Sequence, residues 1–199
     1  MTLRTSRLLT VLATAALTAT AAAYAQDAAK PCPNALVADH GKAAPGKPLA
    51  SPAGAAVTML GGKKLLIKYN SPSVRCRTVM GGLVPYGKPW RLGANAATTL
   101  VADGPLKIGT LSVPAGTYTL YALPEAPGTP WQLIVNKQTG QWGTVYDEKQ
   151  DLGRTPMKYK ALPAPQEVMT LSFEGVKGKK AELHMKWEGT DVSVPVVAE

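Results

Sequence analysis

Histidine is scarce in this sequence, and the motifs of the common enzyme classes are missing. The 199 residues include only two histidines, His40 and His184. Zinc sites usually take three or four His, Cys or acidic ligands, and no such cluster is visible. The sequence also contains no phosphate loop, dinucleotide fingerprint, calcium loop or Gly-x-Ser-x-Gly elbow. We therefore expect no metal and no cofactor, and we assign no catalytic residue.

Acidic residues are outnumbered by basic residues and are scattered along the chain. The 13 acidic residues stand against 22 basic ones, which gives a formal net charge of +9. The nearest approach to an acidic cluster is Asp147, Glu148 and Asp151, which a solvated turn explains. A glycosidase needs two carboxylates that face each other across a sugar. The sequence points to no such pair, but it does not exclude that the fold brings two carboxylates together.

Long hydrophobic runs are also absent, with one short exception near the start of the chain. Residues 8–19 carry no charge, follow Arg4 and Arg7, and precede Ala23-Tyr24-Ala25. A basic start, an apolar middle and small residues before the cleavage point are typical of a signal peptide. A membrane-spanning helix needs about 20 apolar residues, more than this run supplies. We expect residues 1–25 to be removed, the protein to be periplasmic or extracellular, and the mature chain to have no transmembrane segment.

Cysteine occurs only twice, at Cys32 and Cys76. In an oxidising compartment an even number of cysteines favours disulfide bonding. We predict one Cys32–Cys76 disulfide, worth about 4 kcal/mol on the loop-entropy model. A catalytic thiol is the weaker alternative, because the sequence places no catalytic histidine beside either cysteine.

No window sustains the apolar period of an amphipathic helix, and from residue 51 onward a period of two dominates. Side chains of a strand point to opposite faces in turn, so this period predicts half-buried strands. Turn signals separate the strand-like runs, which are residues 57–60, 64–69, 97–102, 106–108, 111–113, 117–123, 131–136, 167–174, 181–188 and 192–196. We predict one all-β domain over residues 51–199, an antiparallel β-sandwich or open barrel of about nine strands. Residues 26–50, rich in Ala, Pro and Gly, are predicted to be a flexible linker.

One long segment, residues 71–96, breaks the alternation. Irregular connections of this length are uncommon in compact domains and are often functional. The segment contains apolar side chains that favour packing, namely Leu83, Val84, Tyr86, Trp90 and Leu92. We therefore predict an ordered loop that folds across the domain.

This loop carries the run Gly-Gly-Leu-Val-Pro-Tyr-Gly-Lys-Pro-Trp-Arg-Leu-Gly-Ala-Asn at residues 81–95. The run resembles the hallmark of a bacterial family of exported proteins, domain-of-unknown-function family 2911, and the resemblance covers residues 51–197. It implies the fold and the location but no activity, because none is established for the family. Ala97 departs from the pattern where an acid is common. Cys76 departs where a glycine is usual, which fits the disulfide with Cys32.

The candidate ligand-binding residues are polar or aromatic side chains in and after this loop: Arg77, Trp90, Arg91, Asn95, Tyr118, Asn136 and Trp142. Guanidinium groups grip carboxylate, sulfate or phosphate, and tryptophans offer flat apolar surfaces to sugar rings. The alternative is structural. Arginine and asparagine tie down loop backbone, and tryptophans in small β domains more often belong to the core.

We predict a non-catalytic exported protein that binds a glycan or an anionic ligand of the cell envelope. One alternative is a hydrolase or isomerase acting on an envelope polymer, with Arg91 stabilising a developing anion. Another is a structural or assembly component of the envelope. No nucleic-acid partner is expected, because the densest basic run, Lys177 to Lys180, has no interleaved aromatic residues and is predicted to be a hairpin tip. The sequence does not fix the oligomeric state.

Overall fold

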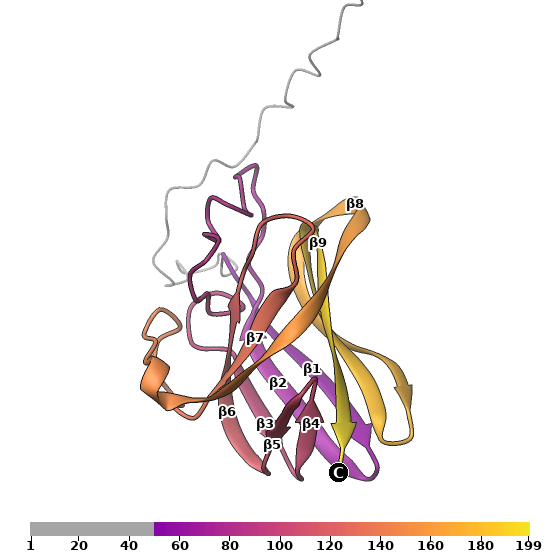
Figure 1. Ribbon diagram of the computed structural model, residues 1–199. Coiled ribbons are helices and arrows are strands. Elements are labelled where there is room, and N and C mark those ends of the chain that lie inside the picture. Colours follow the sequence, from indigo (N-terminus) through magenta and orange to yellow (C-terminus); the bar gives the residue numbers. More distant parts are fainter. Residues whose placement is uncertain (1–49) are drawn as a thin grey trace, which may run out of the picture. The chain divides into compact units, whose positions relative to one another are not determined.

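The structure is a computed structural model that describes residues 50–199. These residues form one antiparallel sheet (Figure 1). Its strands are β1 (Ala53–Leu60), β2 (Lys63–Asn70), β3 (Thr99–Ala102), β4 (Leu106–Ile108), β5 (Leu111–Val113), β6 (Gly116–Leu123), β7 (Trp131–Asn136), β8 (Asp151–Lys177) and β9 (Lys180–Ala198). The all-β prediction is confirmed. The predicted signal peptide, most of the predicted linker, Cys32 and His40 lie outside the described residues.

Helix is almost absent from the part of the chain that the structure describes. The single helical element there is the 3-10 turn η1 (Glu148–Gln150). No helix within residues 50–199 has the length and apolar character needed to span a bilayer.

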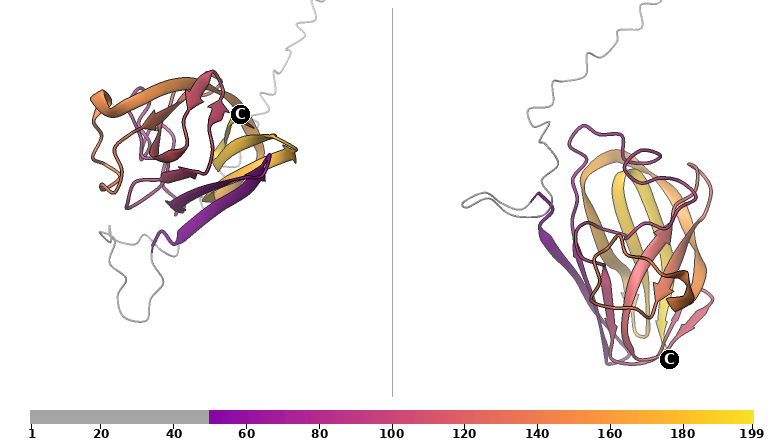
Figure 2. Two further views of the ribbon diagram at one scale, coloured as in Figure 1. Left: turned by 90° about the horizontal axis from the view of Figure 1, so that it is seen from below. Right: turned by 90° about the vertical axis from the view of Figure 1, so that its left-hand side faces the viewer.

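The strand order in the sheet is β1-β2-β3-β6-β7-β8-β9-β4-β5, so β1 and β5 are its edges. The sheet curls until the two hairpins at its opposite parts approach each other (Figure 2). The Gly61 N–H in the β1–β2 turn donates to Gly178 O in the β8–β9 turn over 3.0 Å. The Leu171 N–H of β8 donates to Tyr69 Oη of β2 over 3.1 Å. These bonds give the sheet the form of an open barrel.

The β1–β2 hairpin forms as the sequence predicts. Its turn uses Gly61 and Gly62, whose φ angles of 54° and 81° suit the tight turns that join neighbouring strands. Leu60 and Leu65 beside this turn are fully buried. The lysine-rich turn between β8 and β9 is likewise a hairpin tip, where Lys177 pairs with Lys180.

The core lies between the curled faces of the sheet and includes part of the long loop. Val79, Val84 and Leu92 of that loop are fully buried. Trp90 is 9% exposed and stacks on Trp187 of β9, with ring centroids 5.9 Å apart. The loop is therefore packed against the domain, as predicted.

Strand β9 bends sharply within its length. The Nδ1 atom of His184 lies 2.8 Å from Oδ1 of Asp191, although seven residues of extended strand would separate them by about 23 Å. The bend falls at Glu188, whose φ is 51°, and is followed by Gly189. β8 is irregular at the same level, where its register against β9 shifts between Ala161 and Gln166.

Two features of this hairpin differ from the sequence prediction. The runs 181–188 and 192–196 belong to one bent strand rather than two. Residues 151–161 form the start of β8, where no strand is predicted. Pro156 argues against a central strand there, but Thr155 and Met157 on either side of it point inward and are 1% exposed.

Candidate functional site

Three of the sequence-predicted residues come together in what we call the Arg91 patch: Arg91, Asn95 and Trp142. The Gly143 N–H donates to Asn95 O over 3.0 Å, and Trp142 pairs with Ala96 in an isolated bridge. A Cβ atom added to Gly143 would lie 2.5 Å from Cδ of Arg91. Trp142 stays 49% exposed.

Arg91 has spare hydrogen-bonding capacity. Its Nε donates to Gly93 O over 3.1 Å, and within residues 50–199 its guanidinium makes no other hydrogen bond or ion pair. Partial burial lowers the pKa of this arginine. A half-buried guanidinium without a counter-ion can accept an anion. The hydrolase alternative needs a carboxylate beside Arg91, and the described part of the chain supplies none paired with it.

Arg77 and Trp90 serve the loop itself. The Nε and Nη2 atoms of Arg77 donate to Val74 O over 3.1 Å and to Ser73 O over 2.7 Å. Trp90 belongs to the core through its stack on Trp187. The structure therefore does not join either residue to the Arg91 patch.

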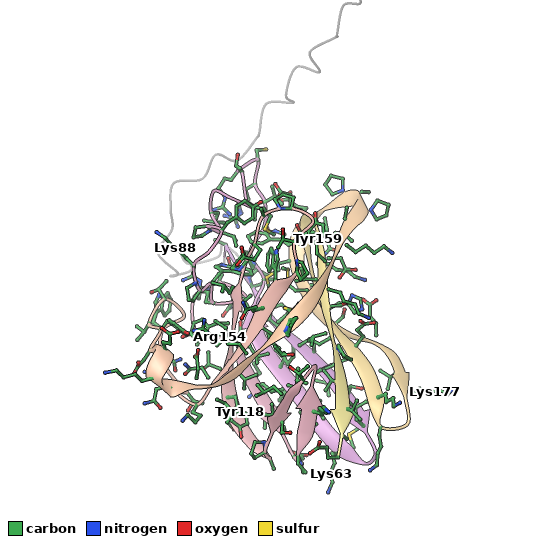
Figure 3. The ribbon with its side chains drawn as sticks, in the orientation of Figure 1. Lys63, Lys88, Tyr118, Arg154, Tyr159 and Lys177 are labelled. Carbon is green, nitrogen blue, oxygen red and sulfur yellow. The ribbon has the colours of Figure 1, made fainter. Side chains whose placement is uncertain are left out.

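Tyr118 and Asn136 lie apart from the loop and have intramolecular partners. The Tyr118 hydroxyl donates to Pro114 O over 3.1 Å, which braces the turn before β6. Figure 3 shows Tyr118 in the lower half of the domain. Asn136 is fully buried, and its Nδ2 donates to Asp147 O and to Asp151 Oδ1, each over 2.9 Å.

Of the acids near η1, Asp147 and Glu148 are exposed, as a solvated turn predicts, whereas Asp151 is largely buried in a hydrogen-bonded network. Asp151 Oδ2 accepts hydrogen bonds from the Tyr146 hydroxyl at 2.8 Å and from Arg154 Nε at 3.1 Å. Arg154 (Figure 3) also pairs with Glu148 at 2.5 Å. Burial, followed by the hydrogen bond to Asp151, raises the pKa of Tyr146 to about 12. Because these groups satisfy one another, they hold the β7–β8 connection in place and offer little to a ligand.

His184 is less exposed than the sequence suggests. Its side chain is 14% exposed, because the bend of β9 brings Asp191 against it. Glu174 beside it is bound by Lys186 Nζ at 2.6 Å, and this hydrogen bond lowers the pKa of Glu174. Within residues 50–199 no group of three His, Cys, Asp or Glu is placed to hold a metal ion.

A pocket of about 380 Å³ opens beside the bend of β9, and we call it the Tyr159 pocket. Tyr159 lies in the upper half of the domain in Figure 3. Four segments meet there: the long loop, the β6–β7 connection with the start of β7, β8, and the bend itself. The lining residues are Met80, Tyr86, Glu125, Pro127, Trp131, Tyr159, Pro165, Glu188, Gly189 and Thr190.

The side chains of this pocket interact with one another. Tyr86, Tyr159 and Glu188 line the same cavity. Burial raises the pKa of Tyr86, and the charges of Glu188 and Tyr159 add to the rise. Glu188 Oε2 accepts a long hydrogen bond of 3.4 Å from the Met80 N–H. Trp131 is 1% exposed, and its Nε1–H has no hydrogen-bond partner among the described residues.

The comparison with known families agrees with the resemblance read from the loop. The model of a family described as protein of unknown function (DUF2911) matches residues 51–196. The chain belongs to this family. No curated protein and no solved structure matches the chain. Within this DUF2911 domain, the run at residues 81–95 supplies Tyr86 to the Tyr159 pocket and supplies Arg91 and Asn95 to the Arg91 patch.

The two sites of the DUF2911 domain differ in charge. The Tyr159 pocket is lined by two carboxylates, Glu125 and Glu188, and by no lysine or arginine. Neither carboxylate forms an ion pair within residues 50–199, where seven such pairs involve other groups. The pocket is therefore negative in a chain whose net charge is +9. It suits a neutral or cationic ligand, whereas the Arg91 patch suits an anion.

Sequence reasoning missed the Tyr159 pocket because its residues are far apart along the chain. Each one has an ordinary local reading: Trp131 as a core residue, Glu125 and Pro127 in a turn, Glu188 on the wet face of a strand. Tyr86 alone lies inside the run that the sequence analysis singles out. The bend of β9, which delivers Glu188, has no sequence signal beyond the glycine that follows it.

Proposed function

We propose that this domain is a non-catalytic exported binding protein whose Tyr159 pocket holds one unit of a glycan. The observation that carries the proposal is the lining of the pocket, where the partly exposed Tyr86 and Tyr159 stand with the carboxylates of Glu125 and Glu188. Aromatic faces pack against the apolar faces of sugar rings, and carboxylates accept hydrogen bonds from sugar hydroxyls. The volume of about 380 Å³ lies in the range of small-ligand pockets.

Export and the cell envelope as the place of action rest on the amino-terminal pattern of the sequence. Residues 1–25 have the basic start, apolar middle and small residues of a signal peptide. Glycans are abundant polymers outside the cytoplasm, so an exported protein with this pocket would meet the ligands that the pocket suits.

A second candidate function is supported by the Arg91 patch alone. The unpaired nitrogen atoms of Arg91, next to the exposed indole of Trp142, can hold a carboxylate, sulfate or phosphate group. This candidate keeps the anionic ligand predicted from the sequence. The two candidates use different side chains and can be separated by mutation.

Equilibrium titration of the mature protein with a panel of neutral, amino and acidic oligosaccharides tests both candidates. We expect Tyr159→Ala to weaken glycan binding at least tenfold and Arg91→Ala to leave it unchanged. The opposite result would place the site at the Arg91 patch: only acidic sugars bind, and only Arg91→Ala weakens their binding. No binding across the panel would contradict the proposal. Release of new sugar ends during the titration would show that the protein is a hydrolase and not a binding protein.

A further inference from the structure

Negative charge without a counter-ion distinguishes the Tyr159 pocket from the other acidic clusters of the domain. Glu174 is paired with Lys186, and Asp151 with Arg154. Glu125 and Glu188, in contrast, have no cationic partner among residues 50–199. Carboxylates that line one cavity without a counter-ion attract a cation that enters it.

The aromatic rings of the pocket favour the same ligand charge. Tyr86 and Tyr159, both partly exposed, line the cavity together with the two carboxylates. The face of an aromatic ring attracts a cation through its quadrupole, and the attraction grows when water is excluded. Rings and carboxylates in one cavity therefore act together on an ammonium group.

The position of Glu188 supports a role beyond folding. Its backbone has a φ of 51°, a conformation that side chains larger than glycine rarely adopt. The next residue, Gly189, would tolerate such a bend without strain. Residues kept in strained conformations concentrate at ligand-binding sites. Here the residue with the strained backbone is Glu188, whose carboxylate lines the pocket.

From these observations we infer that the glycan unit held in the Tyr159 pocket is an amino sugar with a free, positively charged amine. The inference rests on the proposed function, because it takes the pocket as the glycan site. Glu125 and Glu188 hold the ammonium group, and the rings of Tyr86 and Tyr159 pack against the sugar.

The test compares two oligosaccharides that differ only at the amine: a glucosamine tetramer and its N-acetylated counterpart. Calorimetric titration at slightly acidic pH, where the free amine is protonated, measures both dissociation constants on the mature protein. We expect the charged tetramer to bind at least about tenfold more tightly, and this preference to shrink as salt is added. Choline serves as an ammonium probe without sugar oxygens and is expected to bind weakly.

Two isosteric variants and one control locate the effect. Glu188→Gln and Glu125→Gln each remove one pocket charge and are expected to abolish most of the preference. Asp103→Asn changes the net charge equally in an exposed residue after β3 and is expected to keep it.

Three results would overturn the inference while leaving a glycan pocket: equal or tighter binding of the acetylated tetramer, an unchanged preference in Glu188→Gln, or choline binding as tight as the charged tetramer. Failure of both tetramers and of the wider panel would instead refute the proposed function itself.

Discussion

Two half-buried arginines hold their charges in different surroundings. Arg154 donates to Tyr146, Asp151 and Glu148, so its charge is matched on several sides. Arg91 donates to a single carbonyl, and burial lowers its pKa. The first arrangement is typical of a side chain that stabilises the fold. The second carries a desolvation cost that a bound anion would offset.

Truncation of the two arginines is therefore expected to have unequal effects on stability. Arg154→Ala leaves the Asp151 carboxylate, 11% exposed, without its cation and should lower the free energy of unfolding by about 2–3 kcal/mol. Arg91→Ala removes one hydrogen bond and also a desolvation cost, so a change within about 1 kcal/mol is expected. Denaturant unfolding of both variants, with Lys107→Ala at an exposed position of β4 as the control, measures the difference. A larger loss in Arg91→Ala than in Arg154→Ala would make Arg91 a fold determinant.

Tyr146 predicts how stability changes in alkali. Its pKa is raised to about 12 in the folded protein, against an ordinary value near 10. Between these values the unfolded chain loses the proton while the folded chain keeps it, so stability falls as pH rises from 10 to 12. We expect Tyr146→Phe to be less stable than the wild type at neutral pH but to lack this loss in alkali. The difference in free energy of unfolding between the two proteins should therefore shrink by about 1 kcal/mol from pH 10 to pH 12, after allowance for solvent screening. A deficit that stays constant from pH 9 to pH 12 would contradict the assigned pKa.

At the scale of elements, the bend of β9 links the fold to the Tyr159 pocket. Glu188 stands at the bend with a φ of 51°, where a residue with a Cβ atom costs about 1 kcal/mol or more. Glu188→Gly should therefore leave the free energy of unfolding unchanged or raise it by up to about 1 kcal/mol, while it removes a pocket carboxylate and weakens ligand binding. Glu188→Gln keeps the backbone strain and is expected to lose binding without any gain in stability. A Glu188→Gly variant that is clearly less stable would show that the side chain supports the bend.

The turn between β4 and β5 packs tightly against β8. Gly109 has a φ of 56°, and a Cβ atom there would lie 2.1 Å from Thr155 Oγ1. Gly109→Ala combines backbone strain with a clash and is expected to cost more than about 2 kcal/mol. Gly62→Ala is the matched control, because Gly62 has a φ of 81° but no heavy atom within 4 Å of the added Cβ. Thermal unfolding of the two variants separates strain from clash, and equal losses would refute the close contact.

At the scale of the whole molecule, local alternation predicts most of the sheet, and contacts between distant segments explain what it misses. Strands such as β7 alternate or run apolar between clear turn signals, so their burial can be expected from the sequence alone. The start of β8 does alternate, with Pro156, Lys158 and Lys160 at its exposed positions, but a proline argues against a central strand. A strand of this kind is stabilised by its neighbours, a contribution that no local pattern carries.

The candidate site could be predicted only in part for the same reason. Arg91, Asn95 and Trp142 come together because the loops that carry them share backbone hydrogen bonds, and two of the three lie in the family run. Tyr118 and Asn136 have the residue types of a binding site, but turns and buried networks use their polar atoms. The Tyr159 pocket depends on the bend of β9, which brings Glu188 beside Tyr86 across about a hundred residues of sequence.

The predicted Cys32–Cys76 disulfide acts on the whole chain. Cys32 lies outside the described residues, so the pairing stays a prediction based on an even cysteine count and the expected export. A closed loop of this length restricts the unfolded chain, so reduction should lower the free energy of unfolding by up to about 4 kcal/mol. Mass spectrometry of unreduced mature protein treated with an alkylating reagent is expected to find no modified thiol, and the Cys32→Ser, Cys76→Ser double variant should match the stability of reduced wild type. Two alkylated cysteines in the unreduced protein would refute the disulfide, and they would also weaken the argument that this basic domain folds outside the cytoplasm.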